Sequence, residues 1–258
     1  MTGNDRRIVI QARDERLLRE LTVMRVADRE LVKLVGGFRS TTRANARLLA
    51  LVNAGLLRRF FQGTTAGGKK ALYTLSSKGA QLIGSPCNGL RHRSDEMVTA
   101  NFFVAHQMAV NEIYCAAKYG TNPAQGVRFV RWLGFSAPIT PAISLIPDGY
   151  FELRTEQGAL AAFLEIDLGN EGATVWKKKV QNYLRYATSG EFEKRFGQTR
   201  FRVLVITNSE SRLQAIRKTV REVTEKIFWF TTLDAIRREG LWNPVWLRPS
   251  NETLRSSF

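Results

Sequence analysis

Cysteine and histidine are scarce in this sequence of 258 residues, which contains two of each. The two cysteines, Cys87 and Cys115, cannot build a disulfide framework, so a reducing cytoplasm is the expected location. Two histidines are too few for chemistry that needs a histidine cluster to hold a metal. A zinc site is disfavoured because His106 and Cys115 lie nine residues apart on one expected helix and face opposite sides of it.

Long apolar runs are also absent. No run reaches the roughly 18 residues that a membrane-spanning helix needs. The longest candidate, residues 133–146, is interrupted by Pro138 and Pro141. The first 15 residues are too charged for a signal peptide. We therefore expect no membrane contact.

Acidic residues are outnumbered, with 23 Asp plus Glu against 39 Lys plus Arg and a formal net charge of +16. The excess is concentrated in residues 1–95, where 18 basic and 7 acidic residues give a net charge of +11. A basic excess of this size favours a polyanion as partner. Together with the helix and strand pattern of the amino-terminal region, this charge makes double-stranded DNA the expected partner.

The amino-terminal pattern predicts a winged helix-turn-helix. Apolar residues at helical spacing indicate two short helices before residue 36, and Ser40 is a good N-cap for a third helix over residues 41–54. Residues 56–61 and 71–75 read as two strands that flank a loop rich in Gly, Thr and Lys. Three helices followed by such a hairpin resemble winged-helix DNA-binding domains.

Winged helices read the major groove from the start of the third helix and contact phosphates through the wing. The candidate groove residues are Thr41, Thr42, Arg43 and Arg47. The candidate phosphate partners are Arg58, Arg59, Lys69 and Lys70. A solvated basic face, or a winged helix used for protein contacts, is the alternative reading.

The rest of the chain predicts an α/β domain. We place the winged helix at residues 1–84, a linker at 85–95, the second domain at 96–240 and a carboxy-terminal tail at 241–258. The second domain opens with a long helix to residue 119. Three strands follow, at residues 126–132, 144–153 and 159–168, and then a helix at 174–187, a strand at 201–206, a helix at 211–227, a strand at 228–231 and a short helix at 233–239.

Two carboxylates interrupt the otherwise apolar strand at residues 159–168. Period two places Glu165 and Asp167 on one face of that strand. Asp148 lies on the preceding strand, and a tight turn at residues 155–158 brings it close to Glu165. Because Mg²⁺ and Mn²⁺ bind oxygen ligands, Asp148, Glu165 and Asp167 form a candidate metal site, with solvated strand-end carboxylates as the alternative.

This order of elements resembles the PD-(D/E)xK nuclease fold, and Pro147-Asp148 and Glu165-Ile166-Asp167 carry the resemblance. Asp167 stands where the nuclease motif has lysine. In some members the lysine comes from the following helix, and Lys179 is the candidate substitute, with Tyr183 one turn further on. The candidate catalytic residues are Asp148, Glu165, Asp167 and Lys179.

Over residues 12–235 the layout also resembles the replication-relaxation family of plasmids and other mobile elements. The residues that carry this resemblance are the winged-helix pattern, His106 with Val110-Asn111-Glu112, Ile146 to Gly149, Phe163 to Asp167, and Trp176-x-x-Lys179-x-x-x-Tyr183. The resemblance implies a DNA-associated protein in replication control or transfer of a mobile element. A homodimer is a separate expectation. Our first hypothesis is a DNA-binding factor with a silent nuclease-like domain. The second is a Mg²⁺- or Mn²⁺-dependent endonuclease, and the third is a protein-binding winged helix.

Overall fold

The computed structural model describes residues 8–63, 67–87, 97–120, 126–156 and 158–256, with only the backbone described for residues 97–101. The chain divides into two compact units, Met1–Cys115 and Ala116–Phe258. Both contain helices and strands, which confirms the predicted α/β class. Residues 64–66 of the predicted wing loop and residues 88–95 of the predicted linker lie outside the described residues. Within the described ranges, no helix has the length and apolar character needed to cross a membrane.

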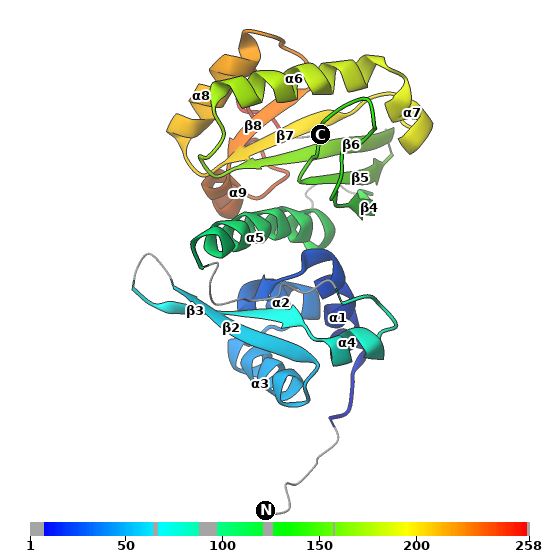
Figure 1. The fold of residues 1–258 in the computed structure, drawn as a ribbon, viewed down its shortest axis with the longest axis vertical. Helices are drawn as coiled ribbons and strands as arrows, with labels where there is room; N and C mark the ends of the chain where they lie inside the picture. The colour runs from blue at the N-terminus through cyan, green and yellow to red at the C-terminus, as the bar shows by residue number, and fades with distance from the viewer. Residues whose placement is uncertain (1–7, 64–66, 88–96, 121–125, 157, 257–258) are drawn as a thin grey trace, which may run out of the picture. The chain divides into compact units, whose positions relative to one another are not determined.

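The first unit consists of short helices and a small antiparallel sheet (Figure 1). Its elements are α1 (Ala12–Met24), β1 (Ala27–Asp28), α2 (Arg29–Gly36), α3 (Thr41–Asn53), β2 (Leu57–Gly63), β3 (Lys69–Leu75), α4 (Ser77–Leu82) and most of α5 (Met97–Tyr119). The Ser40 hydroxyl accepts a hydrogen bond from the Arg43 backbone N–H at 3.4 Å, which caps α3 as the sequence predicts. In the sheet, β3 lies between β1 and β2.

Helix α5 packs on the first unit, whereas the sequence placed it at the start of the second domain. The Asn111 side-chain amide donates to the backbone oxygens of Met24 and Val26, at 2.9 and 2.7 Å. The Tyr114 hydroxyl donates to the buried Glu20 carboxylate. These contacts join α5 to α1, and they give Asn111, one of the residues that carry the family resemblance, a structural role.

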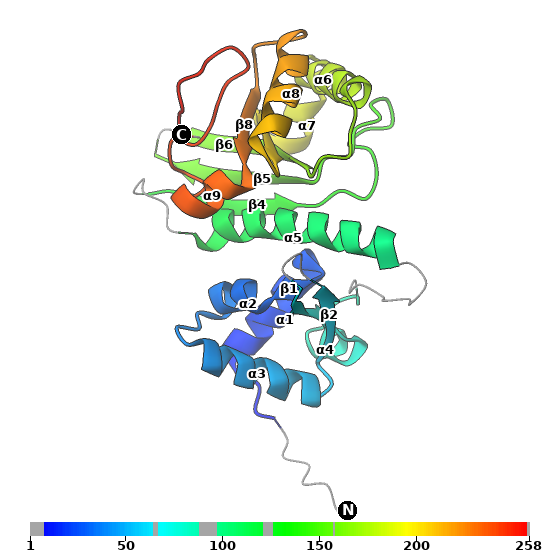
Figure 2. The same ribbon diagram turned by 90° about the vertical axis from the view of Figure 1, so that its left-hand side faces the viewer.

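The second unit is built on a five-stranded sheet (Figures 1 and 2). Its elements are β4 (Arg128–Leu133), β5 (Gly149–Thr155), β6 (Gly158–Asp167), α6 (Ala173–Thr188), α7 (Glu191–Phe196), β7 (Arg202–Thr207), α8 (Glu210–Arg221), β8 (Phe228–Thr232) and α9 (Leu233–Glu239). Helices α6, α7 and α8 lie on one face of the sheet. The strand order is β4-β5-β6-β7-β8. The pairs β4–β5 and β5–β6 are antiparallel, and β6–β7 and β7–β8 are parallel.

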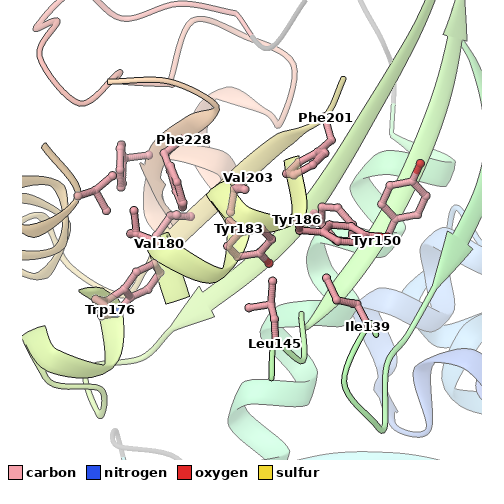
Figure 3. Packing of buried hydrophobic residues seen from close by; sticks show 14 of the residues in the cluster. Ile139, Leu145, Tyr150, Trp176, Val180, Tyr183, Tyr186, Phe201, Val203 and Phe228 are labelled. Atoms are coloured by element: carbon pink, nitrogen blue, oxygen red, sulfur yellow. The ribbon is translucent and has the colours of Figure 1, made fainter. Parts of the chain in front are cut away.

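The core of this unit lies between the sheet and helices α6, α7 and α8. Tyr183 and Tyr186 of α6 are fully buried against Phe201 and Val203 of the β7 segment (Figure 3). Aromatic rings make up much of this cluster, and Phe163 of β6 has its ring centroid 5.7 Å from that of Tyr183. Burial of such large side chains supplies most of the driving force for folding. This core fixes α6 against β6, the two elements that carry the candidate site.

Strand β5, helix α7 and helix α8 differ from the prediction, and α8 ends at Arg221 rather than at residue 227. Strand β5 begins at Gly149 rather than at residue 144, because Pro147 has no N–H to donate and sheet pairing starts with the Asp148 N–H to the Leu164 oxygen at 3.0 Å. Helix α7 was not predicted. The tail returns to the sheet, where Phe230 of β8 and Leu247 exchange backbone hydrogen bonds of 2.9 and 2.8 Å.

Candidate functional site

Glu165 and Asp167 lie on one face of β6, as their spacing predicts, and α6 covers that face. Each side chain is only 1% exposed. Strand β6 is paired on both edges, with β5 and β7, so neither carboxylate can turn into solvent at a sheet edge. Buried carboxylates need partners, and each of these two has its own set.

Glu165 is held by two residues from one face of α6. Lys179 Nζ donates to Oε2 at 2.8 Å, and the Tyr183 hydroxyl donates to Oε1 at 2.6 Å. Positions i and i+4 of a helix lie on the same side, which is why both reach one carboxylate. Burial raises the pKa of Glu165 to about 7. The nearby charge of Lys179 lowers that pKa, and the nearby charge of Asp148 raises it.

Lys179 also contacts a second carboxylate. Its Nζ lies 2.7 Å from Glu171 Oε2, off hydrogen-bonding geometry, so this contact is a charge interaction and the Glu165 contact is the hydrogen bond. Although burial opposes it, the charges of Glu165 and Glu171 raise the pKa of Lys179 above its usual value. Lys179 therefore stays protonated between two acidic side chains.

Asp167 is committed to a different set of donors. Arg212 of α8 contacts it in a bidentate arrangement, with Nε 2.7 Å from Oδ1 and Nη2 2.6 Å from Oδ2. The Trp176 indole N–H donates to Oδ2 at 2.8 Å, and the Gly169 backbone N–H donates to Oδ1 at 2.7 Å. Although burial opposes it, these donors hold the pKa of Asp167 below its usual value.

Asp148 lies beside Glu165, as the predicted hairpin requires. It immediately precedes β5, and its Oδ2 accepts the Ile166 backbone N–H at 2.6 Å. The register pairs Gly149 with Leu164, which places Asp148 next to Glu165 across the two strands. Asp148, Glu165 and Lys179 are thus brought together, and Asp167 is turned to a separate partner.

The predicted metal site is not assembled as a three-carboxylate cluster. Among the described residues, no group of three or more His, Cys, Asp or Glu side chains is placed to hold a metal ion. The physical reason is that Arg212 and Trp176 occupy Asp167, while Lys179 and Tyr183 occupy both oxygens of Glu165. In this arrangement the residues do not fit a divalent cation, which would have to displace Lys179 or Tyr183.

Arg212 is the residue of this site that sequence reasoning missed. The parallel strands β6 and β7 end at the same edge of the sheet, with Asp167 paired to Thr207, so the start of α8 follows directly beside Asp167. No local motif marks Arg212. Only the sheet topology brings it to a residue 45 positions earlier in the chain.

In the first unit, α3 presents an exposed stripe that includes part of the predicted groove set. Ala44, Leu48 and Leu51 are buried against the unit. Thr42, Asn45, Ala46 and Leu49 are exposed at spacings of three and four residues, with Arg43 exposed beside them and Thr41 half-buried. Asn45 was missed by sequence reasoning, although its spacing from Thr42 was the available signal.

Arg47, another predicted groove residue, is half-buried and does not belong to this exposed stripe. Its Nε donates to Asp14 Oδ1 at 2.9 Å, and its Nη2 contacts the same carboxylate and the Val9 backbone oxygen. Asp14 is a buried residue of α1. Arg47 therefore joins α3 to α1, because an unpaired buried carboxylate would be costly.

The four wing residues divide between two faces of the β2–β3 hairpin. Side chains alternate along a strand, and the register pairs Gly63 with Lys69 and Gln62 with Lys70. Arg59 and Lys69 consequently share one face, and Arg58 and Lys70 share the other. Lys70 also forms an ion pair with Asp28, the N-cap residue of α2, so it has a structural partner.

Comparison with known proteins identifies one family. The model of the replication-relaxation family matches residues 16–200, which is most of the chain. No match was found among curated proteins or among solved structures. The matched range contains α3, the β2–β3 hairpin, Asp148, Glu165, Asp167 and Lys179, and it ends before Arg212. The chain therefore belongs to the replication-relaxation family.

Proposed function

We propose that this protein is a DNA-binding factor that acts in the cytoplasm in the replication or transfer of a plasmid or other mobile element. Membership in the replication-relaxation family supports a role in replication or in mobile-element function. The first unit is proposed to be a winged-helix domain that binds duplex DNA. The second unit is proposed to be a nuclease-like domain without catalytic activity.

The observation that carries the DNA-binding proposal is the exposed stripe of α3. Helix α3 contains no acidic residue, and its first turns expose Thr42, Arg43 and Asn45. Hydroxyl, guanidinium and amide groups are the ones that read base edges in the major groove. The amino-terminal end of a helix also favours a phosphate. Arg59 and Lys69, which share one face of the hairpin, would contact the backbone on one side of such a groove.

The observation that favours a silent second domain is the occupation of its carboxylates by protein donors. Glu165 accepts from Lys179 and Tyr183, and Asp167 accepts from Arg212. Each negative charge already has a permanent cation or a hydrogen-bond donor from the same chain. Such an arrangement supports a structural role better than a metal-binding one.

The test of DNA binding is fluorescence anisotropy with a labelled duplex, measured over a range of salt concentrations. We expect Arg43→Ala to weaken binding about tenfold, the cost of one guanidinium contact in the groove. The matched control is Arg16→Ala, an exposed arginine on α1 two residues from the buried Asp14 and therefore on the side away from it. Equal losses in both variants would point to a diffuse charge effect, and the assignment of α3 would then be wrong.

The alternative function is a Mg²⁺- or Mn²⁺-dependent endonuclease that uses Asp148, Glu165 and Lys179. The observation in its favour is that these three side chains lie together, with Lys179 on the helix after the glutamate strand. Supercoiled plasmid incubated in Mn²⁺ and separately in EDTA separates the two functions on one gel. Metal-dependent nicking that disappears in Asp148→Ala would establish the nuclease. A mobility shift with intact plasmid in both lanes supports the DNA-binding factor.

A further inference from the structure

The amino-terminal ends of β7 and β8 gather basic side chains at one edge of the sheet. The two strands are parallel and in register from Val203 and Phe228, so the residues that precede them lie at the same edge. Arg200 and Lys226 are exposed there. Arg202 opens β7, and the tail brings Arg248 to the same place. We call Arg200, Arg202, Lys226 and Arg248 the β7/β8 basic edge.

Two of these four cations contact the ring of Trp229. The guanidinium carbon of Arg202 lies 4.6 Å from the centroid of the Trp229 ring, and that of Arg248 lies 4.8 Å from it. Trp229 is only 9% exposed, so the indole is a fixed platform. Two arginines stacked on one rigid ring have fewer accessible rotamers than two free arginines, which reduces the entropy lost when they bind a ligand.

Among the described residues, positive side chains outnumber negative ones at this edge. Within the described ranges, Arg248 and the nearby Arg255 form no ion pair, and Arg248 instead donates to the backbone oxygen of Glu225 at 2.9 Å. The Glu225 carboxylate accepts a hydrogen bond from the Ser250 hydroxyl at 2.6 Å. Burial and the charge of Arg248 lower the pKa of Arg202, and burial and the charge of Arg255 lower the pKa of Arg248. The positive charges of Arg202, Arg248 and Arg255 therefore repel one another, and an anion bound at this edge would reduce that repulsion.

The Trp229 ring carries one more unsatisfied group. Its indole Nε1–H is buried and has no hydrogen-bond acceptor among the residues that the structure describes. Buried donors are normally paired. An unpaired donor on the ring that both guanidinium groups contact adds to the positive potential of the edge.

We propose that the β7/β8 basic edge is a second DNA contact, which binds backbone phosphates through Arg202, Arg248 and Lys226. Two arginines can each contact a phosphate through two N–H groups, and the exposed Lys226 adds a point charge. This inference rests on the proposed function, because the phosphates belong to the DNA that the protein binds. It assigns to the second unit a role in affinity that needs neither metal nor cleavage.

The salt dependence of DNA binding tests this contact. Each phosphate contact contributes about 0.9 to the slope of the logarithm of the binding constant against that of the salt concentration. We expect Lys226→Gln/Arg248→Gln to lower this slope by about 1.8. When the salt concentration rises from 50 to 200 mM, the binding constant of each protein falls by some factor. For the variant, that factor would be about 12-fold smaller than for the wild type. The matched control is Lys194→Gln/Arg238→Gln, which removes two exposed cations from helices α7 and α9 of the same unit.

The possible outcomes separate this inference from the proposed function. A lower slope in the test pair and an unchanged slope in the control pair supports the contact. Equal slopes in wild type and test pair overturn the contact, while DNA binding itself stands. Wild-type protein that does not bind the duplex overturns the proposed function and this contact with it. A rise in melting temperature with free inorganic phosphate, lost in the test pair while the DNA slope stays unchanged, would show a phosphate-ion site and overturn the DNA assignment.

Arg248 bonds to the backbone, so its substitution affects folding as well as charge. Arg200→Gln/Lys226→Gln is the second test pair, because both side chains are exposed. Circular dichroism and the melting temperature establish that each pair is folded before binding is measured. We expect the second pair to lower the slope as well, and an unchanged slope in a folded second pair counts against the contact.

Discussion

Lys179 Nζ lies 2.8 Å from Oε2 of Glu165, so a helix lysine neutralises a carboxylate that is buried in the centre of a sheet. The lysine stays protonated because the charges of Glu165 and Glu171 raise its pKa. The glutamate carries its charge only above about pH 7, because burial raises its pKa to that value. The pair is therefore an ion pair in weakly alkaline solution, and a protonated glutamic acid beside an ammonium group at lower pH.

Removing the lysine should destabilise the protein most where Glu165 is charged. Lys179→Met leaves the buried carboxylate with Tyr183 as its remaining hydrogen-bond donor. At pH 8 we expect a loss of about 3 kcal/mol in the free energy of unfolding, which is typical when one partner of a buried ion pair is removed. At pH 5 the loss should be about 1 kcal/mol, because the glutamate is then neutral. Urea unfolding at both pH values measures the difference.

Lys178→Met is the control for this experiment, because Lys178 is the exposed neighbour on the same helix. It should change the unfolding free energy by less than about 0.5 kcal/mol. The double variant Lys179→Met/Glu165→Gln should recover most of the stability lost at pH 8, since it leaves no unpaired charge at position 165. Equal losses at the two pH values would contradict the proposed origin of the effect.

Glu165 should make the wild type less stable as pH rises. Its pKa is raised from 4.5 to about 7 in the folded protein, so the native state holds the proton more tightly than the unfolded chain does. This contribution favours the native state fully below about pH 4.5 and is lost as pH rises to about 7. The free energy of unfolding of the wild type, minus that of Glu165→Gln, should therefore decrease from about pH 4.5 to about pH 7. Glu193→Gln, at an exposed position of α7, should show no such trend. If this difference in stability instead grows with pH, the attraction between Lys179 and the charged Glu165 exceeds the cost of burying that charge.

Arg212 should act through the shape of its guanidinium as well as through its charge. Arg212→Lys keeps the positive charge but cannot contact both oxygens of Asp167 in the same way. We expect a loss of about 1–2 kcal/mol for lysine and about 3–5 kcal/mol for Arg212→Met, which leaves the buried Asp167 charge without its cation. Thermal unfolding measures both. The control is Arg221→Lys, at an exposed position on the same helix. A similar loss of stability in this variant would contradict the assignment of the effect to the contact between Arg212 and Asp167.

The sequence predicts most of this architecture because the responsible signals are local. Ser40 marks the start of α3, and alternation along β6 places Glu165 and Asp167 on one face. The partnership of Lys179 and Tyr183 follows from helical spacing once α6 is known to cover that face. Each of these features depends on residues that are close in sequence or on a single packing relationship.

The features that sequence reasoning missed depend on contacts between distant segments. Arg212 reaches Asp167 because two parallel strands end together, and Arg47 reaches Asp14 because α3 packs on α1. Arginine is also the residue type expected at a DNA contact. Nothing in the local sequence pattern distinguishes an arginine that binds phosphate from one that neutralises a buried aspartate. Only the fold decides between these two roles.

Arg47→Lys tests whether this arginine supports the fold or contacts DNA. Its guanidinium contacts both oxygens of the buried Asp14 and the Val9 backbone oxygen, an arrangement that lysine cannot reproduce. We expect the free energy of unfolding to fall by about 1–3 kcal/mol, while the duplex affinity of the folded protein changes by less than about twofold. Arg43→Lys should do the reverse, with unchanged stability and an affinity about tenfold lower. If Arg47→Lys weakens DNA binding and leaves unfolding unchanged, Arg47 contacts the DNA, and α3 does not depend on Asp14 for its position.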